Sequence, residues 1–129
     1  MSNGWHTPDL PSFRIHGWDG DDIIIRLEHY IQVPTSKGTI TIPTGFLSDG
    51  LSIPFLVRPL VGPATGRAFI AGLLHDFLYS RSSTAHYDMT RKDADDLFLE
   101  VMFNLGIGYR RCLIYQAVRA FGWRYWKQK

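Results

Sequence analysis

Apolar and polar residues alternate along the first third of the chain, which predicts β-strands because successive strand side chains point to opposite faces. The alternation begins at Phe13 and is interrupted at Asp19-Gly20, a common turn sequence. It resumes over residues 23–33, which we interpret as one long strand. Its expected core-facing side comprises Ile23, Ile25, Leu27, His29, Ile31 and Val33.

A second turn is predicted at Ser36-Lys37-Gly38, and a third strand over residues 39–42, ended by Pro43. Three consecutive strands joined by short turns predict an antiparallel meander over residues 13–43. The following stretch, residues 44–66, contains three prolines and four glycines. This composition precludes long regular elements, so we expect a long loop there.

After residue 66 the apolar spacing changes to three and four residues, which predicts helices. Residues 67–80 are apolar nearly all round, as expected of a central buried helix. Thr90 and Asp93 resemble a capping box before a second helix that ends near Gly106. Its predicted apolar face comprises Ala94, Leu97, Phe98, Val101, Met102 and Leu105. A third helix ends at Gly122, and its predicted apolar face comprises Ile114, Ala117, Val118 and Phe121.

The predicted fold class is therefore α+β: a small antiparallel β-meander, a long Pro/Gly loop and about three packed α-helices. The chain has 129 residues, which favours one domain. The expected divisions are an N-terminal arm at 1–12 and a single domain at 13–129, containing the meander (13–43), the loop (44–66), the helical part (67–122) and a basic aromatic tail (123–129).

Composition narrows the class of protein. Cys112 is the one cysteine, so the chain has neither an internal disulfide nor a Cys-rich zinc site. The first 20 residues lack a signal-peptide pattern, and no apolar run approaches the ~20 residues of a membrane span. We therefore expect neither a signal peptide nor an integral membrane segment.

The net charge is +2, but its distribution along the chain is uneven, with six basic and no acidic residues after Glu100. This end predicts contact with phosphates, a membrane surface or an acidic protein, and the alternative is a solvated basic helix face. A nucleic-acid partner would rest on this tail alone, and we do not expect one. The partner-binding candidates are Arg119, Trp123, Arg124, Trp126 and Lys127.

The buried helix carries His75, Asp76 and Tyr79, polar groups whose burial is unfavourable unless they find partners. At about 100° per residue, Arg91 and Asp95 lie at the edge of the apolar stripe of the second helix. If the two helices are antiparallel, Asp95 accepts a hydrogen bond from one imidazole nitrogen of His75 and leaves the other as a base. The alternative is a buried polar network in which Arg91 pairs with a carboxylate.

The motif His75-Asp76-x-x-Tyr79, followed by Ala94-Asp95-x-x-Phe98, resembles phospholipases A2, in particular the viral, disulfide-free forms. The resemblance implies that His75 activates water while Asp95 and Tyr79 orient it. It further implies that Asp76 helps to hold a calcium ion, which would polarise the ester carbonyl of the substrate.

A second resemblance covers most of the chain. It rests on Pro43-x-Gly45-Phe46-x-Ser48-Asp49-Gly50-x-Ser52-Ile53-Pro54, on the His75 motif, on Arg91-x-x-Ala94-Asp95-x-x-Phe98 and on Ala117-Val118-Arg119-x-Phe121-Gly122. Together these resemble an uncharacterised domain family of unknown function that is common in tailed bacteriophages and prophages. The resemblance implies a phage origin and a virion or lysis context, with the protein in the virion or, during assembly, in the host cytoplasm.

The segment Ser48 to Ser52 has two interpretations. Asp49 and Ser52 are suited to bond nearby backbone N–H groups, while Gly50 permits a tight turn. Alternatively, Asp49 joins His75 and Asp76 at a metal or polar site.

Two classes of function follow. In the first, a small hydrolase uses His75 and Asp95 against an ester or amide of the bacterial envelope. In the second, a non-enzymatic phage tail or neck component uses the polar cluster as a scaffold and docks on other phage structural proteins. The oligomeric state is open in both.

Overall fold

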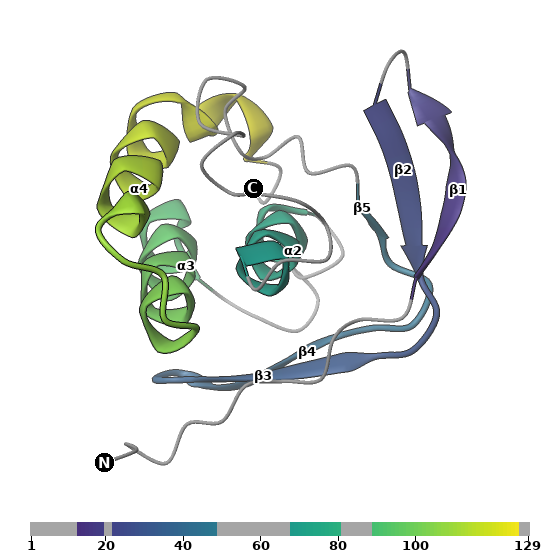
Figure 1. Cartoon of the computed structure of the whole chain (residues 1–129), viewed down its shortest axis with the longest axis horizontal. Helices are drawn as coiled ribbons and strands as arrows, with labels where there is room; N and C mark the ends of the chain where they lie inside the picture. The colour runs from purple at the N-terminus through teal and green to yellow at the C-terminus, as the bar shows by residue number, and fades with distance from the viewer. Residues whose placement is uncertain (1–12, 20–21, 49–67, 81–88, 127–129) are drawn as a thin grey trace. The chain divides into compact units, whose positions relative to one another are not determined.

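The computed structural model describes residues 13–19, 22–48, 68–80 and 89–126. The chain divides into two compact units, Met1–Asp49 and Gly50–Lys129. All described strands belong to the first unit and all described helices to the second (Figure 1). Short antiparallel strands followed by helices confirm the predicted α+β class.

The first unit contains two small antiparallel sheets (Figure 1). In one, β2 (Asp22–Leu27) pairs on one side with β1 (Phe13–Asp19) and on the other with β5 (Leu47–Ser48). In the other, β3 (Ile31–Thr35) pairs with β4 (Gly38–Ile42). Gly38, the last residue of the predicted turn, has a φ of 98°, a left-handed conformation that L-residues rarely adopt.

The prediction of one long strand over residues 23–33 is wrong. The chain bends after Leu27, whose backbone N–H and C=O bond to Phe46 and Gly45, and it continues in the other sheet. Leu27 and Ile31 flank the bend and are both buried. They are an even number of residues apart, so the bend leaves the alternation of apolar positions intact and is invisible in the sequence.

Burial follows the predicted face at three of its six positions, and the side chain of Ile23 lies outside what the structure describes. Leu27, Ile31 and Val33 are buried, and Ile25 is half-buried. His29, assigned to the same face, is exposed because it lies in the bend. The two-residue β5 lies within the predicted loop and is too short to produce a hydrophobic pattern.

The three predicted helices are present. They are α2 (Ala68–Tyr79), α3 (Arg91–Asn104) and α4 (Arg110–Phe121), and a short 3-10 helix, η3 (Gly122–Tyr125), follows the last. Within the described residues, no helix is long and apolar enough to cross a membrane. The core of this unit is formed by α2 and by the predicted apolar face of α3, which is buried throughout. The largest fully buried α2 and α3 side chains include Tyr79, Phe77, Phe98, Leu74 and Met102.

The start of α3 has the capping box that the sequence predicts. The Asp93 backbone N–H donates to Oγ1 of Thr90 at 3.1 Å, and the Thr90 backbone N–H donates to Asp93 Oδ2 at 3.2 Å. These bonds satisfy N–H groups that have no partner inside the helix. They fix where α3 begins, and so they fix the position of Arg91 in its first turn.

The predicted apolar face of α4 is correct at Ile114 and Val118, which are fully buried, and wrong at Phe121, which is 47% exposed. Gly122 is buried instead, and the chain tightens there into η3. The backbone at Gly122 approaches the Tyr79 hydroxyl too closely for a side chain: an added Cβ would lie 2.8 Å from that oxygen. Gly122 is therefore required for close packing, in addition to ending the helix.

Candidate functional site

Asp95 is the centre of a buried polar cluster in the helical unit. Its carboxylate is fully buried and binds side chains from all three helices. Oδ1 accepts hydrogen bonds from His75 Nε2 at 2.8 Å and from the Tyr79 hydroxyl at 2.5 Å. Oδ2 accepts from Arg119 Nη1 at 2.7 Å and forms an ion pair with Arg91 Nη1 at 3.5 Å. We call these five residues the Asp95 cluster.

Helix periodicity explains how α2 and α3 bring the Asp95 cluster together. His75 and Tyr79 are four residues apart on α2, as are Arg91 and Asp95 on α3, so each pair projects from one helix face. Tyr79 contacts both Arg91 and Asp95, and His75 contacts Asp95 and Phe98. The end of α2 therefore lies beside the start of α3, and the two helices run antiparallel, as the dyad hypothesis requires.

Arg91 joins the beginning of α3 to the end of α4. Its guanidinium donates to the carbonyl oxygens of Val118 at 3.2 Å and Arg119 at 3.1 Å, and it approaches the Tyr79 hydroxyl at 3.4 Å. Carbonyls in the last turn of a helix lack partners within the helix. Arg91 bonds the Arg119 carbonyl, shares the Val118 carbonyl with the Gly122 backbone N–H, and adds positive charge beside Asp95.

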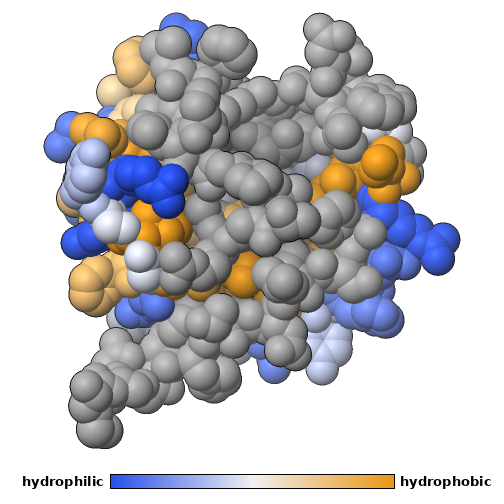
Figure 2. All heavy atoms as spheres, in the orientation of Figure 1, coloured by the Kyte–Doolittle hydropathy of each residue, from blue (hydrophilic) through white to orange (hydrophobic). Residues whose placement is uncertain are grey.

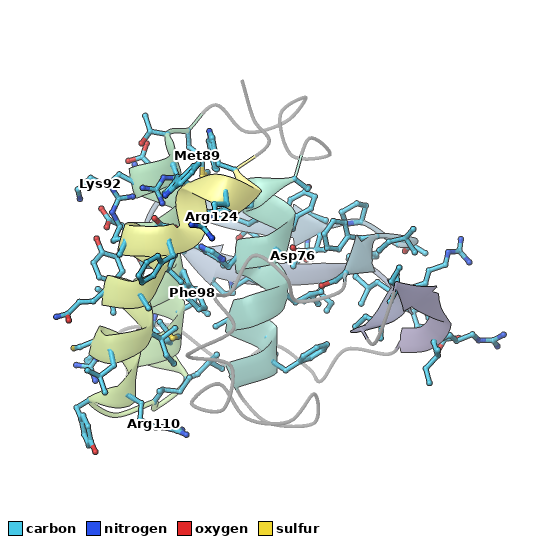
Figure 3. The ribbon with its side chains drawn as sticks, turned by 90° about the horizontal axis from the view of Figure 1, so that it is seen from above. Asp76, Met89, Lys92, Phe98, Arg110 and Arg124 are labelled. Atoms are coloured by element: carbon cyan, nitrogen blue, oxygen red, sulfur yellow. The ribbon has the colours of Figure 1, made fainter. Side chains whose placement is uncertain are left out.

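Aromatic rings enclose the His75 imidazole. The Tyr79 ring lies 4.1 Å from it and the Phe98 ring 4.5 Å, measured between centroids. Figure 3 labels Phe98 on α3 and shows α2 beside that helix. Trp126 meets the Tyr79 ring edge-on at 5.1 Å. The imidazole is fully buried and has little freedom to rotate.

The hydrogen bonds determine which imidazole nitrogen carries the proton. An ionised carboxylate only accepts hydrogen bonds, so the proton in the His75–Asp95 bond resides on His75 Nε2. In the neutral ring, Nδ1 then has an unprotonated lone pair. This Nδ1 is buried and has no hydrogen-bond partner among the described residues.

The pKa values follow from the same contacts. Burial lowers the pKa of His75 below 6.5 and outweighs the opposing effect of Asp95, which keeps the ring neutral at pH 7. Burial acts to raise the pKa of Asp95, but the hydrogen bonds from His75, Tyr79 and Arg119 outweigh it and the net shift is downward. Burial, followed by the bond to Asp95, raises the pKa of Tyr79, so its hydroxyl stays protonated.

The lowered pKa of His75 predicts a loss of stability in mild acid. The unfolded chain takes up a proton on this histidine as the pH falls through 6.5, whereas the folded protein resists until its own lower pKa. The contribution of the neutral His75 to the free energy of unfolding is therefore fully present above pH 6.5 and decreases below it. We expect the melting temperature to fall between about pH 7 and pH 5, and to fall less in His75→Phe.

The same comparison for His29→Phe provides the control, because His29 is exposed. Calorimetry across this pH range measures both variants. An equal pH dependence in the wild type and in His75→Phe would contradict the assignment of a neutral, buried imidazole.

The structure brings together four residues that the sequence selected, namely His75, Tyr79, Asp95 and Arg91, and it adds Arg119. Asp95 lies in the interior, whereas the helical wheel placed it at the edge of the apolar stripe. From the sequence, Arg119 is among the partner-binding candidates, whereas in the structure its guanidinium donates a hydrogen bond to Asp95. In the sequence, Arg119 stands out only as part of the motif Ala117-Val118-Arg119-x-Phe121-Gly122. No spacing along the chain predicts that it binds a residue of α3.

The remaining candidates are distributed as follows. Asp76 is half-buried on α2 (Figure 3). Trp126 is half-buried against Tyr79, whereas Trp123 and Arg124 are exposed. Asp49, Ser52 and Lys127 lie outside the described residues. The described residues contain no group of three or more acidic, histidine or cysteine side chains arranged to hold a metal ion. Of the two residues expected to bind calcium, Asp76 and Asp49, the structure describes Asp76.

A family model described as "Protein of unknown function (DUF1353)" matches residues 25–118. The match begins within β2, extends over most of α4 and includes the whole Asp95 cluster except Arg119. Neither the curated proteins nor the solved structures contain a match to the chain.

Proposed function

The chain belongs to the DUF1353 family of proteins of unknown function, and we propose that it is a hydrolase in which His75 acts as a general base. The observation that carries the proposal is the lone pair on His75 Nδ1, which is buried and has no partner among the described residues. Buried polar atoms nearly always have a hydrogen-bond partner, and exceptions concentrate at sites where a ligand or a reaction needs the group.

The contacts of the imidazole suit proton transfer from water. Asp95 holds the Nε2 proton at 2.8 Å, which fixes the tautomer and directs the basic Nδ1 away from the carboxylate. When Nδ1 takes a proton from water, the negative charge of Asp95 stabilises the imidazolium. Tyr79, Arg119 and Arg91 hold Asp95 in its orientation and act as positioning residues.

In the proposed reaction, His75 Nδ1 removes a proton from water while the water oxygen attacks an ester carbonyl carbon. The tetrahedral intermediate then expels the alcohol, which takes the proton back from His75. One ester bond is broken, one water molecule is consumed, and a carboxylic acid and an alcohol are produced.

The proposed substrate class is a phospholipid ester of the bacterial envelope, and the proposed setting is a virion or lysis protein of a tailed bacteriophage. Support comes from the similarity of the His75 and Asp95 motifs to viral phospholipases A2 and from the phage distribution of the sequence family that the chain resembles. Calcium, with Asp76 as a ligand, belongs to the same proposal.

A second candidate function is a non-enzymatic component of a phage tail or neck. The observation that favours it is the complete burial of both His75 and Asp95, with arginines from α3 and α4 fixing the carboxylate. A network of this kind also links three helices without any reaction.

Fatty-acid release from phospholipid vesicles distinguishes the two functions. The full chain is incubated with phosphatidylglycerol–phosphatidylethanolamine vesicles at neutral pH, with calcium or with a chelator. We expect fatty-acid release with calcium. Continued release above background with the chelator would show that calcium is not required, while still supporting the hydrolase. Absence of fatty-acid release under both conditions would contradict the hydrolase. The presence of the protein in purified virions would then support the structural role.

A further inference from the structure

The outward side of α4 and of the residues at its two ends carries exposed apolar and aromatic side chains. Ile114 and Val118 hold the opposite side of the helix in the core. Tyr109, Leu113 and Trp123 are 78%, 46% and 61% exposed, respectively. Gln116 and Ala120 of α4 are also exposed. With Leu113, with Tyr109, which precedes α4, and with Trp123, which lies in η3, they recur at intervals of four, three, four and three residues and define a stripe along residues 109–123. We call these five residues the α4 outer face.

Positive charge borders this face. Arg110 and Arg124 are exposed and lie at opposite ends of the helix segment (Figure 3). The Arg124 guanidinium lies over the Trp123 ring, 5.4 Å from its centroid. No acidic residue follows Glu100 in the sequence. Asp96 contacts α4 by accepting a hydrogen bond from Tyr115. It also accepts one from Lys92 at 2.8 Å, so its negative charge is compensated by that lysine.

Orange and blue spheres lie next to one another on the side of the molecule where α4 lies (Figure 2). Tyr109 and Trp123 have rings with one polar edge, a type that concentrates at the boundary between water and lipid. They lie at the two ends of the stripe, with Leu113 between them. This order suits a helix lying parallel to a membrane surface.

A second copy of the chain is a poorer occupant of this face. A symmetric pairing would bring Arg110 and Arg124 of one copy against the same basic residues of the other, and like charges repel. The charge on the face requires a negative partner. We propose that the α4 outer face docks on the surface of an anionic lipid bilayer, with Tyr109, Leu113 and Trp123 inserted at headgroup depth and with Arg110 and Arg124 on lipid phosphates.

This inference is independent of the hydrolase proposal. It uses residues outside the Asp95 cluster, and a protein with no catalytic activity would bind in the same way. Vesicles of ether-linked lipids, which contain no ester bond to cleave, separate the two: binding to them reports docking alone.

Flotation of the full chain with ether-linked phosphatidylglycerol–phosphatidylcholine vesicles tests the docking surface. We expect co-flotation that weakens when the vesicles are made of phosphatidylcholine alone, and that weakens at high salt because ions screen the arginines. L113S/W123S should reduce the partition coefficient roughly tenfold, since two apolar groups are lost from the contact. R110Q/R124Q should reduce binding to anionic vesicles about tenfold and leave binding to neutral vesicles unchanged.

The matched control is I15S/Y30S, which removes two side chains of similar exposure, 61% and 62%, from the first unit. We expect it to float like the wild type. Circular dichroism establishes that each variant is folded. Absence of wild-type flotation, or equal flotation of L113S/W123S, would overturn the proposal. Sedimentation as a dimer that L113S/W123S abolishes, without vesicle binding, would assign this face to a second copy instead.

Discussion

Asp95→Asn is expected to lower the free energy of unfolding by about 3 kcal/mol, because breaking a buried charge cluster leaves its partners uncompensated. The substitution removes the negative charge that faces two guanidinium groups. Arg119 and Arg91 retain side-chain exposures of 32% and 20%, so water compensates in part and the effect falls at the low end of the range for buried pairs. Chemical denaturation measures the loss.

Asp96→Asn provides a matched control one residue away. Asp96 pairs with Lys92, but both side chains are substantially exposed, at 43% and 64%. Exposed helix pairs of this spacing contribute about 0.5 kcal/mol or less. Equal destabilisation by the two substitutions would show that the buried cluster does not support the fold.

His75→Phe is expected to reduce ester hydrolysis by about 10²-fold or more, the usual effect of removing a general base. Its effect on stability should be small, within roughly 1 kcal/mol. A phenyl ring retains the packing against Tyr79 and Phe98, and Asp95 keeps its bonds to Tyr79 and Arg119. The lost hydrogen bond is offset because the unsatisfied Nδ1 is also removed.

Fatty-acid release and chemical denaturation, measured on the same preparation, separate catalysis from stability. His29→Phe is the control, and it should change neither quantity because His29 is exposed in the first unit. Undiminished release by His75→Phe would rule out the base role. A stability loss as large as that of Asp95→Asn would instead assign His75 to a structural network.

The sequence was sufficient for the elements whose formation depends on neighbours along the chain. The apolar run of α2, the three-and-four spacing in α3 and the capping box at Thr90 were correctly predicted, because these signals come from residues close together along the chain. The same periodicity placed His75 one turn from Tyr79, and Arg91 one turn from Asp95.

The bend after Leu27 was decided by pairing with residues 45–48, a partner that strand alternation does not reveal. The burial of Gly122 in place of Phe121 likewise depends on a distant group, the Tyr79 hydroxyl. In both places the deciding contact joins segments that are far apart along the chain.

The Asp95 cluster combines both kinds of information. The sequence by itself determined that His75 and Tyr79 project from one face of α2 and that Asp95 projects from the same face of α3 as Arg91, because both spacings follow from 3.6 residues per turn. Only the tertiary structure decided that Asp95 is fully buried and that Arg119 binds it from α4, 24 residues along the chain. Packing of a third helix against the first two brings that charge to the carboxylate, and such packing depends on the whole core rather than on any local spacing.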